Sequence, residues 1–190
     1  MFDEAPDGAP GHEQTRLENV EDMSDNSGPM VGVVMGSQSD WATMQHANLT
    51  LDKLGIANEA RVISAHRTPD LLEEWIGTAR ERNMKIIIAG AGMAAHLAGV
   101  TAAKTSLPVL GVPLGGGALD GVDALYAMVQ MPKGIPVGTL AIGKSGAINA
   151  ALLAASILAL SDDDIAEAYE NFRRNQTEQG VANSVPEAVV

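Results

Sequence analysis

The chain has 190 residues, a formal net charge of −12 and no cysteine. This length suits one globular domain with a tail, and the missing cysteine excludes disulfides and thiolate metal sites. The acidic balance argues against a general nucleic-acid binder. No signal-like segment opens the sequence, and the most apolar stretch, residues 147–160, is too short to span a membrane, so we expect a cytoplasmic protein that does not bind membranes.

Residues 1–29 hold eight acidic residues, one basic residue and few large apolar ones, which predicts a disordered acidic tail. From Val31 onward, short apolar runs alternate with segments of helical spacing, which predicts a single α/β catalytic domain over residues 30–180 and a C-terminal tail over 181–190. We expect Thr68 and Ser161 to cap the second and the last helix. In chain order, the expected strands are 31–35, 61–63, 86–89, 109–112 and 137–142, and the expected helices are 41–54, 70–83, 94–105, 122–128, 145–160 and 162–179.

This alternation predicts a three-layer α/β/α sandwich with a central parallel sheet, flavodoxin-like or Rossmann-like. Ligands of such sheets bind at the carboxyl ends of the strands, where the strand order reverses, so the loops after the strands are the candidate site. The helix at 145–160 is apolar on nearly every side. That pattern favours a homo-oligomer with this helix between neighbours, although a crowded monomer core explains it too.

The loop after the first strand contains Gly36, Ser37, Ser39 and Asp40. Backbone N–H groups at a helix start, together with serine hydroxyls, suit a phosphate group, and Asp40 can accept hydrogen bonds from ribose hydroxyls. A plain helix cap by Ser39 or Asp40 explains the same pattern equally well.

The loop after the second strand places His66 beside Arg67. A histidine can give and take protons near neutral pH, and an arginine offers a fixed fork for phosphate or carboxylate. A surface His-Arg pair is the alternative, but the position at a strand's carboxyl end favours function.

The loop after the third strand, Gly90-Ala91-Gly92-Met93-Ala94-Ala95-His96, resembles a dinucleotide fingerprint, but the acid required about twenty residues later is missing. We therefore reject a nicotinamide site and expect these small residues to let a substrate ring approach the backbone. His96 is either a second site histidine or a buried structural one. Residues 138–145 match the P-loop pattern, but their spacer is strand-like where a P-loop needs a loop, which argues against an ATP site. No cluster has metal-ligand spacing.

Several segments resemble class I N5-carboxyaminoimidazole ribonucleotide mutases, in order, over about residues 31–176. They are Met35–Trp41, Ser64–Pro69, Ala89–Gly92, Ala94–Leu97, Leu110–Pro113 and Val129–Gly143. The resemblance implies an isomerase of purine biosynthesis that works without metal, ATP or organic cofactor. It moves a carboxylate from the exocyclic nitrogen to ring carbon 4 of aminoimidazole ribonucleotide through trapped CO2, in a small, closed, apolar pocket.

The resemblance also assigns roles to residues. His66 is the general acid and base. Phosphate and ribose are expected at Gly36, Ser37, Ser39, Asp40 and Arg67, and the base and carboxylate at Ser64, Ala65, Ala89, Gly90, Ala91, Gly92, His96 and Leu97. A homo-octamer and an ATP-dependent carboxylating synthetase as pathway partner are implied as well.

Two positions depart from the family pattern, where Met93 replaces a glycine and Ala98 a proline. The segment Leu114–Gly117 is also richer in glycine than is usual in the family, which suggests a mobile loop near the site. If position 93 needs a positive φ, methionine is strained there, and if its side chain points into the pocket, the CO2 chamber shrinks.

Three alternatives remain. The first is a class II relative that carboxylates aminoimidazole ribonucleotide directly with CO2. The second is a non-catalytic flavodoxin-like phosphate-binding module, although Ala89-Gly90 stands where a receiver domain needs its aspartate. The third is a P-loop ATPase.

Overall fold

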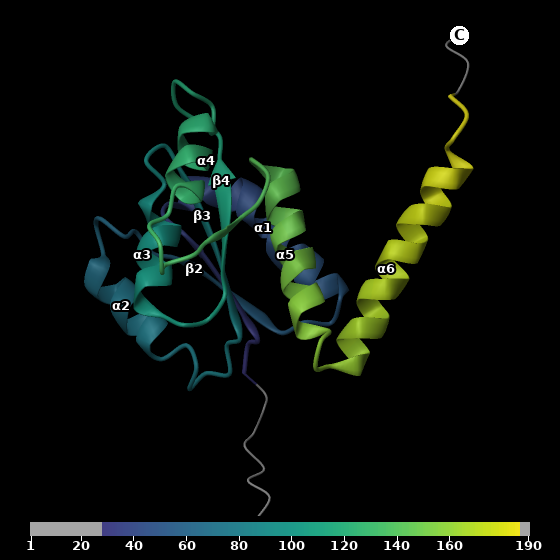
Figure 1. The fold of residues 1–190 in the computed structure, drawn as a ribbon, viewed down its shortest axis with the longest axis horizontal. Helices are drawn as coiled ribbons and strands as arrows, with labels where there is room; N and C mark the ends of the chain where they lie inside the picture. Colours follow the sequence, from purple (N-terminus) through teal and green to yellow (C-terminus); the bar gives the residue numbers. More distant parts are fainter. Residues whose placement is uncertain (1–27, 187–190) are drawn as a thin grey trace, which may run out of the picture.

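The computed structural model describes residues 28–186, which form a five-stranded sheet between two layers of helices (Figure 1). The strands are β1 (Val31–Met35), β2 (Asn58–Val62), β3 (Ile86–Gly92), β4 (Val109–Leu114) and β5 (Gly138–Thr139). All neighbours pair in parallel in the order β2-β1-β3-β4-β5. This is the flavodoxin-like order, which confirms the predicted fold class. Residues 1–27 and 187–190 of the predicted tails lie outside the described residues.

Helices cover both faces of the sheet. A short 3-10 turn, η1 (Gln38–Asp40), precedes the first of them. The helices are α1 (Trp41–Lys53), α2 (Pro69–Gly77), α3 (His96–Lys104), α4 (Val122–Val129), α5 (Lys144–Leu158) and α6 (Asp163–Ala182). One apolar core lies between the sheet and α1 with α5, and a second lies between the sheet and α2, α3 and α4 (Figure 1). None of the helices in residues 28–186 is long and apolar enough to cross a membrane.

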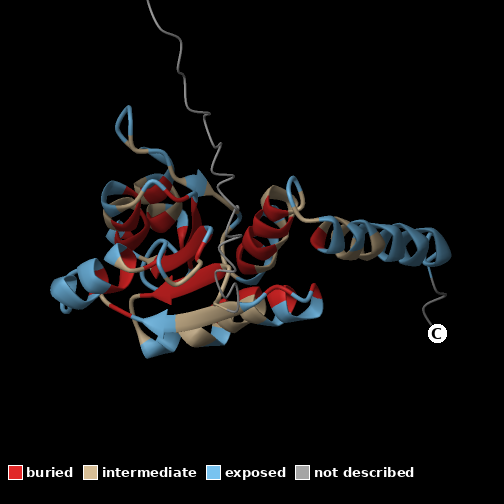
Figure 2. Ribbon diagram, turned by 90° about the horizontal axis from the view of Figure 1, so that it is seen from below, coloured by how far each residue is buried: buried red, intermediate tan, exposed pale blue. Residues whose placement is uncertain are grey.

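The three inner strands are buried along their length, which explains their unbroken apolar sequence. Successive side chains of β1 alternate between the two cores, with Val33 in one and Val34 in the other. Figure 2 shows this buried centre, with exposure concentrated at the helix ends, the loops and the outer helix α6.

Several strands and helices begin or end at other residues than the sequence predicted. The strand β2 begins at Asn58, earlier than expected, because an edge strand tolerates the polar Asn58 and Glu59. The helix α2 ends at Gly77, well before the predicted residue 83. The strand β5 has two residues where six were expected, and α3 starts at His96, two residues late.

Both predicted side-chain caps are wrong. Thr68 precedes α2 but makes no cap bond, because its hydroxyl accepts from the Ser64 N–H and donates to the Ser64 carbonyl. Asp162 caps α6, accepting from the Ile165 N–H at 3.1 Å, and the preceding Ser161 does not.

The apolar character of α5 is largely explained within the chain. Its buried alanines pack against α1 and the sheet, and Leu153 is 38 % exposed. The helix α6 behaves differently: Ile165 is its one fully buried residue among those described, and Figures 1 and 2 show it projecting away from the body.

Candidate active site

A cavity of about 660 Å³ lies at the carboxyl ends of the strands, beside the boundary between β1 and β3. This boundary is the point where the strand order reverses, which is where parallel sheets of this kind bind ligands. Four loops form the cavity wall, one after each of β1, β2, β3 and β4. The lining residues are Gly36, Ser37, Ser39, Asp40, Ser64–Arg67, Ala91–Leu97 and Gly115–Gly117.

The first loop is a compact hydrogen-bonded turn. The Ser37 N–H donates to Asp40 Oδ2 at 3.0 Å, and the Ser37 hydroxyl oxygen accepts from the Ser39 N–H at 3.3 Å and from the Ser39 hydroxyl at 2.9 Å. Ser37 is therefore the cap, of η1, whereas Asp40 makes no side-chain cap bond to α1. The cap expected from Ser39 or Asp40 is therefore wrong for α1: Asp40 is only the acidic member of the Ser37 capping box of η1, and all three residues line the cavity.

Asp40 carries a perturbed carboxyl group. Burial raises its pKa above the ordinary value of 3.8, and this effect outweighs the opposing backbone hydrogen bonds at Ser37 and Gly36 and the positive charge of Arg67. The hydrogen bonds and the positive charge that the chain supplies to the Asp40 carboxylate therefore offset only part of the cost of burying its charge.

Arg67 connects the first two loops. Its guanidinium donates to the Gly36 carbonyl at 2.8 Å, and its backbone N–H donates to the Ser64 hydroxyl at 3.2 Å. A guanidinium offers five N–H donors in a planar fork, and this contact engages one end of it. The side chain is exposed at the cavity, which suits it to an anionic ligand group.

His66 and His96 meet across the cavity, although thirty positions separate them in sequence. His66 Nε2 lies 2.8 Å from His96 Nδ1, and the rings are edge to face with centroids 5.0 Å apart. Such a contact needs one ring nitrogen as donor and the other as acceptor, so the tautomers of the two rings depend on each other. His96 is exposed at the start of α3, which rules out the alternative of a buried structural histidine.

The third loop holds two non-glycine residues in the left-handed region, Met93 with a φ of 54° and Ala95 with a φ of 41°. Each such residue costs on the order of 1 kcal/mol or more, and strain of this kind gathers at ligand sites. The turn delays the start of α3 and turns His96 toward the cavity. From the sequence, methionine is expected to be strained if position 93 has a positive φ, and position 93 does have one.

Two predicted contact residues lie behind the cavity wall. Ala89 is fully buried in the core, and a Cβ on Gly90 would lie 2.3 Å from the sulfur of Met44. Conversely, Met93–Ala95 and Gly115–Gly117 line the cavity without having been predicted as contacts. The rule that ligands bind after strand ends pointed to the loop after β4, but its glycines carry no reactive group to single them out.

The expectation of a closed apolar pocket is wrong for the single chain. His66, Arg67 and His96 are exposed, as are Met93 and the glycines of the loop after β4. Anything that encloses a ligand here must come from movement of these loops or from a neighbouring chain.

The P-loop-like segment cannot cradle a phosphate. The Leu140 N–H donates to the Gly111 carbonyl at 2.9 Å, and the Gly143 N–H donates to the Pro113 carbonyl at 2.8 Å. These amides extend the pairing with β4 and are not free for a ligand. Within residues 28–186, no group of three or more histidine, aspartate or glutamate side chains could hold a metal ion.

A second cavity, of about 740 Å³, lies at the other end of β4. Its lining includes Lys104 but no histidine or carboxylate, and Lys104 is paired with Glu73 at 2.6 Å. This lining offers no group for proton transfer, so we assign the chemistry to the smaller cavity.

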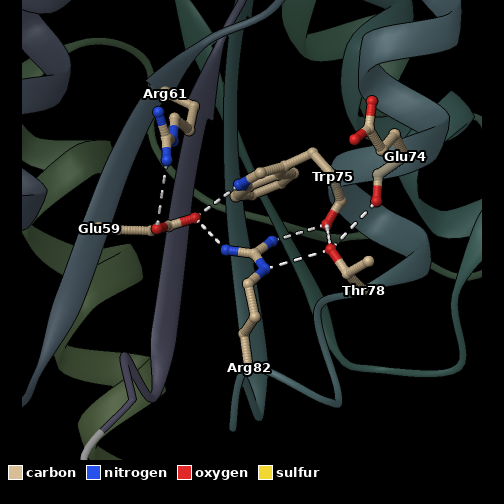
Figure 3. Close-up of polar contacts among 6 residues, drawn as sticks. All are labelled: Glu59, Arg61, Glu74, Trp75, Thr78 and Arg82. Carbon is tan, nitrogen blue, oxygen red and sulfur yellow. Dashed lines mark hydrogen bonds and ion pairs between the residues drawn. The ribbon is translucent and has the colours of Figure 1, made fainter.

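A second polar cluster lies at the sheet edge. Figure 3 shows Glu59 of β2 accepting from Trp75 Nε1 at 2.6 Å and pairing with Arg82. Arg82 also donates to the Trp75 carbonyl at 2.7 Å and to the Thr78 hydroxyl at 3.2 Å, and it lies over the Trp75 ring. Burial alone would raise the pKa of Glu59. The hydrogen bonds from Trp75 and Arg82 and the nearby positive charges lower it by more than burial raises it, so the pKa lies below its ordinary value of 4.5.

The chain is similar to known proteins over most of its length. The family model described as AIR carboxylase matches residues 30–179. Relatives named N5-carboxyaminoimidazole ribonucleotide mutase are 60 % identical in Vibrio vulnificus, 56 % in Bacillus subtilis and 54 % in Escherichia coli. These alignments cover 82 %, 85 % and 86 % of this chain and 97 %, 99 % and 98 % of the relatives. The crystal structure of Treponema denticola PurE matches with a TM-score of 0.74 and 26 % identity, over 82 % of this chain and 96 % of that one.

Proposed function

Because this chain belongs to the AIR carboxylase family, we propose that it is an enzyme that converts N5-carboxyaminoimidazole ribonucleotide into its ring-carboxylated isomer. The names of its relatives support this isomerase role in purine biosynthesis. The observation that carries the proposal is the contact of His66 with His96 at 2.8 Å, inside a cavity whose other walls suit a phosphoribosyl group.

The phosphate and ribose occupy the end of the cavity formed by the first loop and Arg67. Serine hydroxyls and the guanidinium fork match phosphate oxygens, and the Asp40 carboxylate accepts from ribose hydroxyls. The base and carboxylate lie toward the two histidines, against Ser64, Ala65, Ala91, Gly92 and Leu97. Gly90 acts from behind, since its lack of a side chain lets β3 lie close to Met44, while Ala89 packs in the core on the other face of the sheet.

His66 moves one proton twice. The carbamate C–N bond breaks, its electron pair returns to the exocyclic nitrogen, and protonated His66 supplies the proton there, which leaves aminoimidazole ribonucleotide and CO2. Ring carbon 4 then attacks CO2 and forms the new C–C bond. The now neutral His66 removes the ring proton and restores aromaticity, so the enzyme ends as it began. His96 holds the His66 ring through the shared hydrogen bond.

We propose further that the chain works in the cytoplasm as a homo-oligomer, an octamer by family resemblance. The projecting helix α6 and the exposed apolar Val122, Tyr126 and Val129 of α4 support an assembly. By the same resemblance, an ATP-dependent carboxylating synthetase supplies the carbamate nucleotide. Residues 30–180 are the catalytic domain.

A paired assay tests the reaction. Wild type and His66→Asn are each given the carbamate nucleotide, or aminoimidazole ribonucleotide with bicarbonate, without ATP. We expect wild type to consume the carbamate and His66→Asn to retain binding while losing roughly 10³-fold in turnover, the usual scale for a general acid and base. Unchanged turnover in the variant would refute the role of His66. Preferential use of the nucleotide with bicarbonate would indicate the direct carboxylase instead.

A further inference from the structure

Met93 occupies a position that neither packing nor backbone preference explains. Its side chain is 64 % exposed, so it adds little to the hydrophobic core, and its φ of 54° is unfavourable for a residue with a Cβ. A glycine here would relieve the strain, and a polar residue would suit the exposure. The methionine therefore has a cost to folding that a role at the cavity can account for.

The side chain of Met93 bridges two loops of the cavity wall. Met93 lies on the loop after β3, and its Cγ is 3.4 Å from the point where a Cβ on Gly117, in the loop after β4, would stand. Gly117 has a φ of 100°, a conformation that favours glycine, and a Cβ there would be in ordinary van der Waals contact with Met93. Both residues line the cavity, so the thioether side chain lies at the edge of the cavity beside the loop that contains Gly117.

The loop opposite Met93 is held by Asp120. The Asp120 carboxylate accepts from the Gly116 N–H at 3.3 Å, and the Asp120 N–H donates to the Gly117 carbonyl at 3.4 Å. No atom lies within 4 Å of the place where a Cβ on Gly116 would stand, so no side chain packs against the turn there. A turn held in this way can shift relative to Met93 as a unit.

An unbranched apolar side chain suits a gate over CO2. Methionine adapts its shape to irregular gaps, and its apolar surface neither hydrates CO2 nor binds the water that would replace it. We propose that Met93 is the gate of the cavity, closing against the 115–117 glycine loop to retain CO2 between the two half-reactions. This inference rests on the proposed function.

Three substitutions separate the gate from the strained backbone. Met93→Leu keeps an apolar side chain of similar size. Met93→Ala removes the side chain but keeps the Cβ and its strain, and Met93→Gly removes both. Leu119→Ala is the matched control, because Leu119 is 60 % exposed on the neighbouring turn and is not part of the cavity lining.

The readout is the fate of CO2 when the carbamate nucleotide carries a ¹³C-labelled carboxylate in unlabelled bicarbonate buffer. Aminoimidazole ribonucleotide released per isomer formed, and label lost from the isomer, are measured against a protein-free blank. We expect both quantities to rise roughly tenfold in Met93→Ala and Met93→Gly, the lower end of what a few apolar groups contribute to discrimination. Met93→Leu and Leu119→Ala should match wild type.

The outcomes distinguish the gate from the reaction itself. If Met93→Ala loses no more CO2 than wild type, the gate is refuted while the isomerase stands. If only Met93→Gly leaks, the backbone conformation and not the side chain retains CO2, and the gate is again refuted. A wild-type protein that forms no isomer contradicts the proposed function, and the gate with it.

Discussion

The chain holds two polar clusters built from similar groups, and they have opposite electrostatic character. At the sheet edge, hydrogen bonds and positive charge more than offset the burial of Glu59 and lower its pKa. At the cavity, burial dominates at Asp40 and raises its pKa, despite backbone hydrogen bonds and Arg67. The Glu59 carboxylate is stabilised by partners within the chain, whereas the partners of the Asp40 carboxylate do not offset its burial.

The two arginines repeat the contrast. The Arg82 guanidinium bonds Glu59, the Trp75 carbonyl and the Thr78 hydroxyl, while within residues 28–186 the Arg67 guanidinium makes one hydrogen bond, to the Gly36 carbonyl. A cluster with saturated partners stabilises the fold, and a cluster with spare donors and acceptors is available to a ligand. The comparison predicts that substitutions in the cavity change catalysis, and substitutions at the edge change stability.

The largest effect after loss of His66 is expected from His96→Asn. His96→Asn removes the ring nitrogen that shares a hydrogen bond with His66 Nε2, so the His66 ring loses the partner that holds it and that can exchange a proton with it. We expect the turnover number to fall by about tenfold, with a change in the shape of its pH profile. His46→Asn is the control, because His46 lies on α1 outside the cavity lining.

Steady-state rates across pH 5.5–9, taken with unfolding midpoints, decide the role of His96. A proportional loss of rate at every pH would mean that His96 only supports the wall, whereas a changed profile marks it as the positioning partner of His66. An unaltered rate would remove the pair from the mechanism.

The sequence predicts a feature of this structure well where residues close together in the chain determine it, and poorly where contacts between distant residues do. The central strands were predicted at Val31, Ile86 and Val109 because burial on both faces leaves an unbroken apolar run. The start of β2 at Asn58 was missed because an edge strand has no such signal.

The same reasoning applies to the site. The loop positions of His66 and His96 follow from the alternation of strands and helices. Their 2.8 Å contact does not, because it depends on the register of β3 beside β1 and on the left-handed turn before α3. The resemblance placed Gly90 in the pocket, whereas its tight approach to Met44 is a property of packing that only coordinates show.

At the sheet edge, Glu59→Gln should lower stability by about 1 kcal/mol at pH 7 and leave turnover unchanged, because it replaces a charge-assisted pair with a neutral one. The folded-state pKa of Glu59 is lowered, so its contribution is complete above the ordinary value of 4.5 and is lost as the pH falls through the folded value. The difference in stability between wild type and Glu59→Gln should therefore shrink at acid pH. Urea unfolding of both proteins at pH 7 and at acid pH measures it.

Glu73→Gln is the matched control for that measurement. Glu73 pairs with Lys104 at 2.6 Å, but its side chain is 69 % exposed, and such pairs add little. Equal losses for Glu59→Gln and Glu73→Gln would mean that the edge network is an ordinary surface feature.

The smallest effect on stability, and the one that can reverse sign, is expected from Asp40→Asn. Asparagine keeps an oxygen to accept from the Ser37 N–H, so the turn survives while the buried charge disappears. The folded-state pKa of Asp40 is raised, so its favourable contribution is complete below the ordinary value of 3.8 and is lost as the pH rises through the folded value. At pH 7, Asp40→Asn should therefore equal or exceed wild type in stability, by a few tenths of a kcal/mol at about half burial.

The same substitution should weaken substrate binding, because an amide oxygen accepts from ribose hydroxyls less strongly than a carboxylate does. Urea unfolding at pH 4 and pH 7 and the KM for the carbamate nucleotide measure the two effects on one variant. If Asp40→Asn destabilised the protein as Glu59→Gln does and left KM unchanged, Asp40 would be a structural carboxylate like Glu59. Higher stability together with weaker binding would instead show that the chain holds this charge at a cost to its own folding, because the ligand supplies the partners that the fold does not.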